Sequence, residues 1–362
     1  MKVRFIILLI SLWYSATTCA QTGNRSAITP SFRIVHSGSN FRHPPFRNCH
    51  AATVTETGRD TLLYAWFGGD YEGSDNTAIW GCFRYLKKKK QWGTVQLLAA
   101  GKDSTGHSKA CWNPVLYKTS GGILFLYYKT GSNPREWRGE RKTSADNGKT
   151  WSIAERLPAS FLGPVKNKPL QRNDGTLLYP SSTESTDLKT WTIHVESTDA
   201  TGGHWQYIPI ACDSFAVIQP AILQYGMDTL QLLCRSRQNK IIETWSFDNG
   251  NTWSALHPLD LPNPNSGIDA VTLHNGWQLL IYNPMMPGKE WWEGRSVLKA
   301  AVSKNGKDWQ DVITIEQHDT GEYSYPAVIQ DSGGIIRIAY TKNRTTINFV
   351  DLRIINDDSD TK

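Results

Sequence analysis

The stretch Gly122-Ile-Leu-Phe-Leu-Tyr-Tyr128 is one of six similar segments, and their repetition along the chain decides the fold. Each segment is a run of apolar, mostly strand-forming residues that begins directly after a Gly or an Asp, as a strand does after a tight turn. The other five are Asp60-Thr-Leu-Leu-Tyr-Ala-Trp66, Gly175-Thr-Leu-Leu-Tyr179, Asp228-Thr-Leu-Gln-Leu-Leu233, Gly276-Trp-Gln-Leu-Leu-Ile281 and Gly334-Ile-Ile-Arg-Ile-Ala339. Consecutive copies lie 48 to 62 residues apart, so six units account for nearly all of the 362 residues.

A second short strand precedes each copy, and the turn between the two carries Gly, Asp or Asn, as hairpin loops require. These strands are His50-Ala-Ala-Thr-Val54, Asn113-Pro-Val-Leu-Tyr117, Asn167-Lys-Pro-Leu170, Gln219-Pro-Ala-Ile-Leu223, Ile268-Asp-Ala-Val-Thr272 and Tyr325-Pro-Ala-Val-Ile329. Each unit is therefore predicted to begin with a β-hairpin.

A turn motif recurs later in the units, in the region of a second hairpin. Ser144-Ala-Asp-Asn-Gly-Lys-Thr-Trp151 and Ser246-Phe-Asp-Asn-Gly-Asn-Thr-Trp253 are complete copies of Ser-x-Asp-x-Gly-x-x-Trp, and 303–309 and 197–205 hold partial copies. Ser and Asp side chains bond backbone groups in turns, Gly accepts positive φ, and Trp packs the hairpin against its neighbour. The motif is thus predicted to be structural.

Four strands in each unit, repeated six times without helical periodicity, predict an all-β, six-bladed β-propeller with four-stranded blades. We expect the tract Ser31-Phe-Arg-Ile-Val35 to lie beside Thr345-Thr-Ile-Asn-Phe-Val350 and to complete the last blade. A pair of β-sandwiches is the main alternative, although sandwiches seldom repeat so evenly.

The N-terminus has the features of a targeting segment. Two basic residues precede an apolar stretch from Phe5 to Tyr14, and small residues lead up to Ala20. We therefore expect residues 1–20 to be a cleavable signal peptide and 21–362 to form one propeller domain, secreted or periplasmic. The apolar stretch is too short to span a bilayer, so membrane insertion is not expected.

Charge and cysteine content narrow the possible partners. The net charge is +6, and the only basic run is Lys87–Lys90, so nucleic acid is not an expected partner. A mild excess of cations suits an acidic substrate. The five cysteines after residue 20 are scattered without Cys-x-x-Cys spacing, which indicates neither a metal site nor a disulfide framework. We expect a monomer without metal or cofactor.

The Ser-x-Asp-x-Gly-x-x-Trp boxes resemble the Asp-boxes of sialidases, and from His50 to Val350 the chain is similar to the bacterial sialidase-like (BNR-repeat, predicted neuraminidase) family. The resemblance also rests on Cys49-His-Ala-Ala-Thr53, Trp66-Phe-Gly-Gly-Asp70, Asn133-Pro-Arg-Glu-Trp137, Gly163-Pro-Val-Lys-Asn-Lys168, Pro262-Asn-Pro-Asn-Ser-Gly-Ile-Asp269 and Gly321-Glu-Tyr-Ser-Tyr-Pro326. It implies a six-bladed propeller that acts on a terminal acidic sugar.

Hairpin topology predicts which face holds the site. The start of the first strand and the end of the second lie on one face, and the first strand is innermost, so its opening residues gather around the axis. The Asp-boxes then fall on the opposite face. The opening residues are His50, Asn113, Asn167 with Lys168, Gln219, Asp269, and Tyr325 with Tyr323. The ends of the second strands add Trp66, Asp70, Arg135, Arg235 and Arg237.

These residue types suit a sugar that carries a carboxylate, because Arg binds carboxylates bidentately, Trp stacks on rings and amides bind hydroxyls. We predict that His50, Asp70, Asp269 and Tyr323 are catalytic; Tyr323 and Tyr325 are expected to share one side of their strand. The predicted substrate-binding residues are Trp66, Asn113, Arg135, Asn167, Lys168, Gln219, Arg235, Arg237, Arg295 and Tyr325. The resemblance implies that Arg235 and Arg295 belong to a set of three arginines, with Arg33 or Arg47 as the third.

Three activities remain open. Hydrolysis of a terminal acidic sugar would use a Tyr nucleophile with a Glu as its base and an Asp as general acid, but Gln224 stands where the resemblance implies that Glu. A lyase acting on a uronate glycan would instead use Tyr or His to abstract the C5 proton, with a cation or amide on the carboxylate. A glycan-binding propeller without catalysis is the third. We place hydrolysis first.

Overall fold

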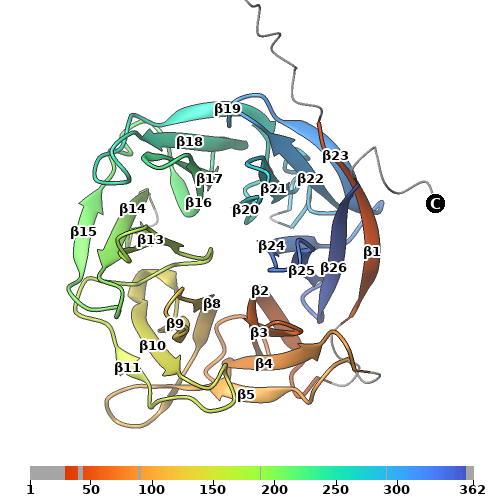
Figure 1. Cartoon of the computed structure of the whole chain (residues 1–362). Coiled ribbons are helices and arrows are strands. Elements are labelled where there is room, and N and C mark those ends of the chain that lie inside the picture. Colours follow the sequence, from red (N-terminus) through yellow and green to blue (C-terminus); the bar gives the residue numbers. More distant parts are fainter. Residues whose placement is uncertain (1–28, 40–43, 89–90, 188, 291, 356–362) are drawn as a thin grey trace, which may run out of the picture.

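The computed structural model describes residues 29–39, 44–88, 91–187, 189–290 and 292–355. The predicted signal peptide, residues 1–20, lies outside these ranges. Six four-stranded antiparallel sheets stand around a central axis (Figure 1), so the six-bladed β-propeller predicted from the repeat is confirmed.

Each blade runs outward from the axis in chain order, except the last. Blade 1 consists of β2 (Asn48–Gly58), β3 (Thr61–Gly69), β4 (Ala78–Tyr85) and β5 (Gln96–Ala99). Blade 2 consists of β8 (Cys111–Lys118), β9 (Leu124–Thr130), β10 (Arg138–Ser144) and β11 (Glu155–Arg156). Blade 3 consists of β12 (Leu170–Gln171), β13 (Leu177–Glu184), β14 (Trp191–Thr198) and β15 (Gln206–Pro209).

The second half of the ring repeats the pattern. Blade 4 consists of β16 (Val217–Tyr225), β17 (Thr229–Ser236), β18 (Lys240–Ser246) and β19 (His257–Pro262). Blade 5 consists of β20 (Asp269–Thr272), β21 (Gln278–Tyr282), β22 (Val297–Ser303) and β23 (Gln310–Gln317). Blade 6 consists of β24 (Tyr323–Gln330), β25 (Ile336–Lys342), β26 (Thr346–Ile355) and β1 (Ser31–Ser39). A two-stranded sheet, β6 (Gly101–Lys102) with β7 (Ser108–Lys109), and the 3-10 helix η1 (Pro134–Glu136) lie outside the blades.

The N-terminal strand completes blade 6, as predicted. β1 pairs antiparallel with β26, with Ser31 opposite Ile355 and Ser39 opposite Asn348. The ring is therefore closed by hydrogen bonds between strands from the two ends of the described chain. A buried ion pair links this last blade to blade 1, because Arg84 of β4 donates two hydrogen bonds, of 2.9 and 2.8 Å, to the carboxylate of Asp351 in β26.

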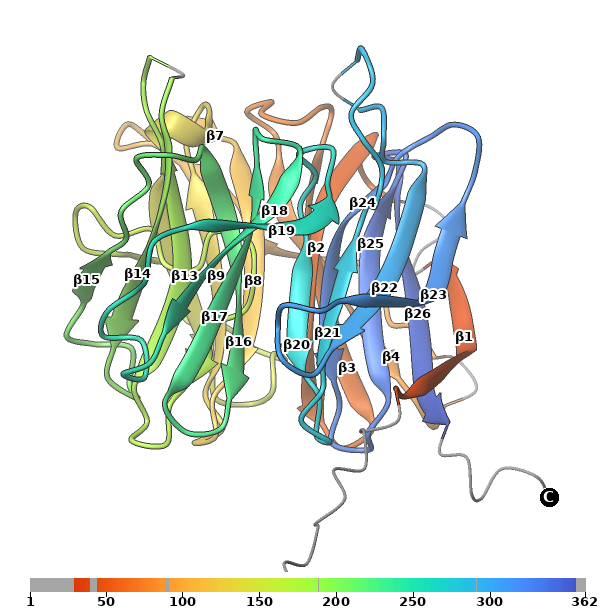
Figure 2. The ribbon, with the colours of Figure 1, turned by 90° about the horizontal axis from the view of Figure 1, so that it is seen from above.

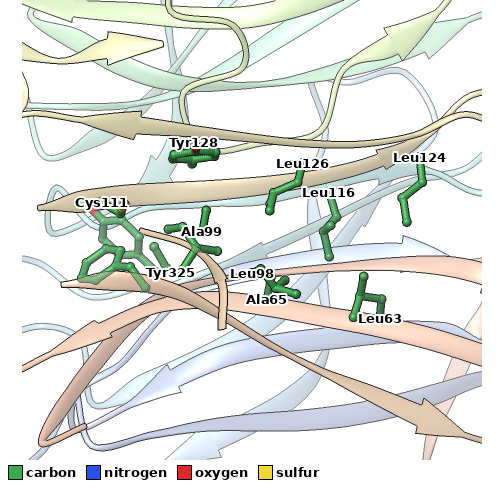
Figure 3. Close-up of a cluster of buried hydrophobic side chains, with 13 residues drawn as sticks. Leu63, Ala65, Leu98, Ala99, Cys111, Leu116, Leu124, Leu126, Tyr128 and Tyr325 are labelled. Atoms are coloured by element: carbon green, nitrogen blue, oxygen red, sulfur yellow. The ribbon is translucent and has the colours of Figure 1, made fainter. Parts of the chain in front are cut away.

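The hydrophobic core is divided into clusters that fill the spaces between neighbouring blades. The cluster between blades 1 and 2 contains Leu63 and Ala65 of β3 and Leu124 and Leu126 of β9 (Figure 3). Similar clusters separate the other neighbouring pairs. Side chains on both faces of a blade are buried in this way, which explains why the strands are nearly continuous apolar runs rather than alternating ones.

The Asp-boxes close turns on the face opposite the starts of the innermost strands. In the first complete box, the Ser144 hydroxyl accepts a hydrogen bond from the Gly148 backbone N–H, and the Asp146 carboxylate accepts one from the backbone and one from the side chain of Thr150. The second complete box repeats these bonds. Neither complete box lies on the face where the innermost strands start, in line with a structural role.

The five cysteines in the described ranges are all free thiols, and all but Cys212 are buried. Burial raises the pKa of the Cys82 thiol to about 11. Such groups behave as small apolar core residues. Within the described ranges, no helix has the length and apolar character needed to cross a membrane.

Candidate functional site

A small cavity of about 130 Å³ lies at the mouth of the axis where the innermost strands begin. Blades 1, 2, 3, 4 and 6 all contribute to it, and the β6–β7 sheet marks the same face in Figure 2. Its lining combines aromatic, cationic, acidic and amide side chains: Glu72, Trp112, Asn113, Pro134, Trp137, Glu184, Trp191, Ile218, Gln219, Arg235 and Tyr325.

Backbone bulges bring three of these side chains to the axis. Asn113, Gln219 and Tyr325 have positive φ angles of 38°, 55° and 51°, and each lies at a register shift near the start of its innermost strand. Ala51 occupies the same position in blade 1, with a φ of 55°. This backbone region is strained for residues other than Gly, at roughly 1–3 kcal/mol each, and such strain is concentrated at functional sites. A bulge also redirects the side chain that it carries.

Arg235 of β17 lines the cavity and is held in place by four hydrogen bonds to other described residues. Its Nη1 donates to the Tyr325 hydroxyl at 2.5 Å and to Oε1 of Gln219 at 3.3 Å, and its Nε donates to Oδ1 of Asn265 at 2.9 Å. Nη2 also donates to the backbone carbonyl of Asn265. The guanidinium is thereby fixed in one orientation beside a phenol oxygen, and only 7% of the residue is exposed.

Two further arginines belong to the same network. Arg295 shares the Asn265 carbonyl with Arg235 and donates to Glu322 at 3.0 Å, while Arg344 donates to the other oxygen of Glu322 at 2.9 Å and to Glu72. Burial alone would raise the pKa of Glu322, but Arg344 and Arg295 outweigh it and hold that pKa below its ordinary value. Three guanidinium groups against two carboxylates leave a net positive charge near the cavity.

Glu184, at the end of β13, is the acidic group on the blade 3 side. Burial raises the pKa of its carboxyl above the ordinary value, and the positive charges of Arg235, Arg135 and Arg237 offset this only in part. A raised pKa favours the protonated form of a carboxyl, which is the form that a general acid needs.

The aromatic walls come from three tryptophans. The indole rings of Trp112 and Trp137 lie 5.7 Å apart at an angle of 51°, and Trp191 carries the guanidinium of Arg237 at 4.1 Å from its ring centroid. Flat apolar walls with polar groups at the base are typical of sugar sites.

His50 lies behind the cavity rather than in its lining. Its ring packs on the Tyr325 ring with centroids 4.0 Å apart, and neither ring nitrogen makes a hydrogen bond to a described residue. Burial lowers the pKa of His50 well below its ordinary value, and the surrounding cations, Arg344 first, lower it further. The imidazole is therefore neutral and supports the phenol from behind.

Three other predicted residues lie deeper along the axis. Asn167 donates to the backbone carbonyls of Gln219 and Pro220, which links blade 3 to the bulge of blade 4. Lys168 pairs with Asp269 at 2.9 Å and reaches the opposite mouth, where it lines a hollow of about 520 Å³. The innermost strands start at the cavity and run along the axis toward the opposite mouth. The pair of Lys168 and Asp269 lies along this path, so neither residue lines the cavity.

Tyr323, Trp66 and Asp70 also lie away from the cavity. The bulge at Tyr325 turns it away from the side of β24 that carries Tyr323, so the two do not share a side as expected, and Tyr323 stacks on His318 between blades 5 and 6. Trp66 is fully buried between blades 1 and 6, where no sugar can reach it. Asp70 is exposed outside the lining, although Glu72, two residues later, belongs to it.

Arg135 and Arg237 lie at the rim. Arg135 lines an adjoining groove, and Arg237 covers Trp191. The proposed third arginine is neither Arg33, which lies on the outermost strand of blade 6, nor Arg47, which is exposed before β2 and is absent from the lining and from the arginine network. Its place near Glu322 is taken by Arg344.

Sequence reasoning missed several members of the site. Arg344 follows the end of β25, a second strand of a blade, so extending the topological rule by two residues would have found it. Asn265 belongs to the Pro262–Asp269 tract, and only the folded chain shows that it holds Arg235. Within the described ranges, no cluster of three His, Cys, Asp or Glu residues is arranged to hold a metal ion.

Comparison with solved structures places this architecture among the sialidases. The chain superposes on a protein of unknown function from Dyadobacter fermentans with a TM-score of 0.73 and 15% identity, over 90% of this chain and 100% of that one. The NanB sialidase from Streptococcus pneumoniae gives 0.67 and 12%, over 89% and 70%. The Trypanosoma rangeli sialidase gives 0.67 and 16%, over 84% and 55%. At these identities the likeness establishes the fold.

No curated protein matches the sequence. A family model does: the BNR repeat-like domain matches residues 60–338, which covers all the repeated hairpins except the start of the first blade and the end of the last. The matched region contains both complete Asp-boxes, Arg235 and Tyr325. The chain therefore belongs to the BNR repeat-like family, with a sialidase-like fold.

Proposed function

We propose that this protein is a secreted, exo-acting glycoside hydrolase that removes a terminal acidic sugar from glycans. One observation carries the proposal: the Tyr325 hydroxyl lies 2.5 Å from a guanidinium nitrogen of Arg235 in a cavity that also contains Glu184, a carboxyl with a raised pKa. The sialidase-like fold supports a glycosidase-type activity. The signal segment expected in residues 1–20 supports secretion, and a monomer is proposed.

Substrate binding follows from the chemistry of the lining. Arg235 and its neighbouring arginines supply the positive field that attracts a sugar carboxylate. Asn113 and Gln219 supply amides for hydroxyl groups, and the tryptophan walls supply ring contacts. The small volume of the cavity favours one terminal sugar over an internal chain segment.

Catalysis in this proposal divides between two side chains. Glu184 gives its proton to the glycosidic oxygen as the bond from that oxygen to the anomeric carbon breaks. The Tyr325 hydroxyl gives its proton to solvent as its oxygen, held beside Arg235, forms a bond to the same carbon. Water then attacks this carbon: its hydroxyl stays on the sugar, its proton returns to Glu184, and the Tyr325 oxygen leaves and takes up a proton from solvent.

The test pairs Tyr325→Phe with Tyr323→Phe. Both changes keep the ring and so preserve packing, but only the first removes a hydroxyl from the cavity. We expect Tyr325→Phe to lower kcat by about 10²–10⁴-fold and Tyr323→Phe to leave it near wild type. The assay is release of the terminal sugar from sialylated and uronate-terminated oligosaccharides. Full activity in Tyr325→Phe would exclude the mechanism.

Elimination is the second candidate, and one contact favours it: the described partner of the Tyr325 hydroxyl is Arg235, whereas a Tyr nucleophile in a hydrolase is expected to have a carboxylate base. Tyr325 would then abstract a C5 proton from a uronate. Mass spectrometry separates the two reactions, because hydrolysis adds one water across the cleaved bond and elimination does not. Glycan binding without either product would identify a non-catalytic binding protein.

A further inference from the structure

A wide groove continues outward from the cavity between blades 2 and 3. Its volume is about 510 Å³, and it shares three lining residues with the cavity: Pro134, Trp137 and Glu184. Its lining residues come from blade 2 and from the end of β13 in blade 3, and these two blades are neighbours in Figure 1. Because one wall belongs to both, a molecule bound in the cavity can extend into the groove.

The groove is both apolar and cationic. Trp137 and the stretch from Leu157 to Leu162 supply its apolar lining, and Arg135, Arg138 and Arg156 supply positive charge. None of these three arginines makes an ion pair with a carboxylate of a described residue, whereas Arg141 of the same blade is paired with Glu155 at 2.9 Å. Their charges are thus available to a ligand.

A third hollow extends the cationic path beyond the groove. It has a volume of about 380 Å³ and shares Arg138 and Arg156 with the groove. Lys102 and Lys109, from the β6–β7 sheet, also line it, while Asp103 and Glu136 are its acidic members. Positive side chains therefore outnumber negative ones along the whole path, which we name the blade 2 track: the groove and this hollow, with Arg135, Arg138, Arg156, Lys102 and Lys109.

The position of Glu184 indicates which part of the substrate would lie in the track. In the proposed function, on which this inference rests, Glu184 protonates the oxygen that leaves with the rest of the glycan. Glu184 lies in the wall common to the cavity and the groove. The leaving part of the substrate is therefore on the groove side when the terminal sugar is in the cavity.

We infer that the blade 2 track binds the leaving-group side of an oligosaccharide whose units carry further anionic groups, carboxylates or sulfates. Sugar rings lie against Trp137 and Phe161, and the anionic groups lie near the arginines and lysines. The natural substrate is accordingly an acidic glycan chain, not a single acidic sugar that caps a neutral one.

The test compares substrates that differ only beyond the cleaved bond. The Arg138→Ala/Arg156→Ala double variant is assayed on an aryl glycoside of the terminal sugar and on acidic oligosaccharides of increasing length, with carboxylate-bearing and sulfate-bearing series run separately. Two lost charge contacts predict a drop in kcat/KM of about tenfold on the longer acidic substrates, with no change on the aryl glycoside. The series that shows the larger drop identifies the anionic group.

Arg59→Ala/Lys149→Ala is the matched control, because it removes the same charge from exposed residues on the opposite face. It should leave all substrates unaffected. Two results would rule out binding of the oligosaccharide in the blade 2 track. One is an unchanged kcat/KM on long substrates in Arg138→Ala/Arg156→Ala, and the other is an equal loss on the aryl glycoside.

A separate readout distinguishes this failure from failure of the proposed function. If the wild-type protein cleaves no substrate, the glycosidase proposal fails, and titration calorimetry with the same oligosaccharides still tests the track. Binding that weakens about tenfold in Arg138→Ala/Arg156→Ala, and not in the control, supports it. Equal binding by wild type and variant overturns it.

Discussion

At the scale of single residues, the site depends on side chains whose ordinary properties are altered by their surroundings. Arg235 has donors committed to Gln219, Tyr325 and Asn265, so its position is fixed before any ligand arrives. Preorganised charge of this kind contributes more to catalysis than a mobile cation does, because little reorganisation is needed during the reaction. Glu184 complements it with a carboxyl that burial keeps protonated to higher pH.

The raised pKa of Glu184 predicts the pH dependence of the reaction. A general acid must be protonated, so activity should be present below the pKa of Glu184 in the folded protein and lost as the pH rises through it. Activity should fall at a higher pH than the ordinary pKa of a glutamate would predict, because burial raises the pKa of Glu184. The measurement is kcat/KM against pH for wild type and Glu184→Gln.

The Glu184→Gln variant should have a low kcat/KM and should not show the loss of activity that wild type shows as the pH rises through the pKa of Glu184. An aryl glycoside with a good leaving group, which needs little protonation, should recover much of the lost rate. A variant that keeps both the wild-type pH dependence and the wild-type rate would show that another group is the acid.

At the scale of strands and turns, the sequence predicted the hairpins and the face that carries the axial cavity, because strand direction follows from hairpin topology alone. It could not predict the bulges. Strict alternation places Tyr323 and Tyr325 on one side of β24, whereas the positive φ of Tyr325 places only that residue in the cavity. The orientation of Trp66 was equally hidden, since it depends on contacts between blades 1 and 6, which are distant in sequence.

The Asp-box turns should respond to acid. Hydrogen bonds from the Thr150 side chain, then from its backbone, lower the pKa of Asp146 from 3.8 to about 2. A carboxylate with a lowered pKa stabilises the fold above its ordinary pKa, and this contribution is lost as the pH falls from about 4 to about 2. We therefore expect Asp146→Asn to lower Tm at neutral pH and to differ less from wild type at pH 2.

Thermal unfolding followed by circular dichroism across this pH range provides the measurement. Asp319→Asn is the control, because Asp319 is exposed and makes no hydrogen bond to another described residue. A Tm difference for Asp146→Asn that stays constant from neutral pH to pH 2 would contradict the assignment. Activity per folded molecule should be unchanged, since the box lies on the face opposite the cavity.

At the scale of the whole molecule, the ring is held by contacts between blades that are neighbours in space. The cavity has lining residues from five blades, so its geometry depends on closure of the ring. Blade 6 supplies Tyr325 and carries the β1–β26 pairing. Incomplete closure of the ring is therefore expected to change the positions of the residues that line the cavity.

Removal of residues 31–39 tests this dependence. The deletion leaves β26 as an unpaired edge, and exposed edges promote association between chains. We expect a lower Tm, a shift to larger species than the full chain forms in light scattering, and weaker glycan cleavage. A synthetic peptide of residues 29–39, added in trans, should restore part of each property. A deleted protein with the same size in light scattering and the same Tm as the full chain would show that β1 is dispensable.

The pairing of β1 with β26 also has a consequence for biosynthesis. The first strand of the ring to be synthesised finds its partner only after more than three hundred further residues have emerged, since Ser31 lies opposite Ile355. Five blades can assemble in sequence as they leave the ribosome, but the sixth must wait. The joining of β1 to β26 is therefore a late step of folding, and chaperones that shield β1 during this interval would act on that step.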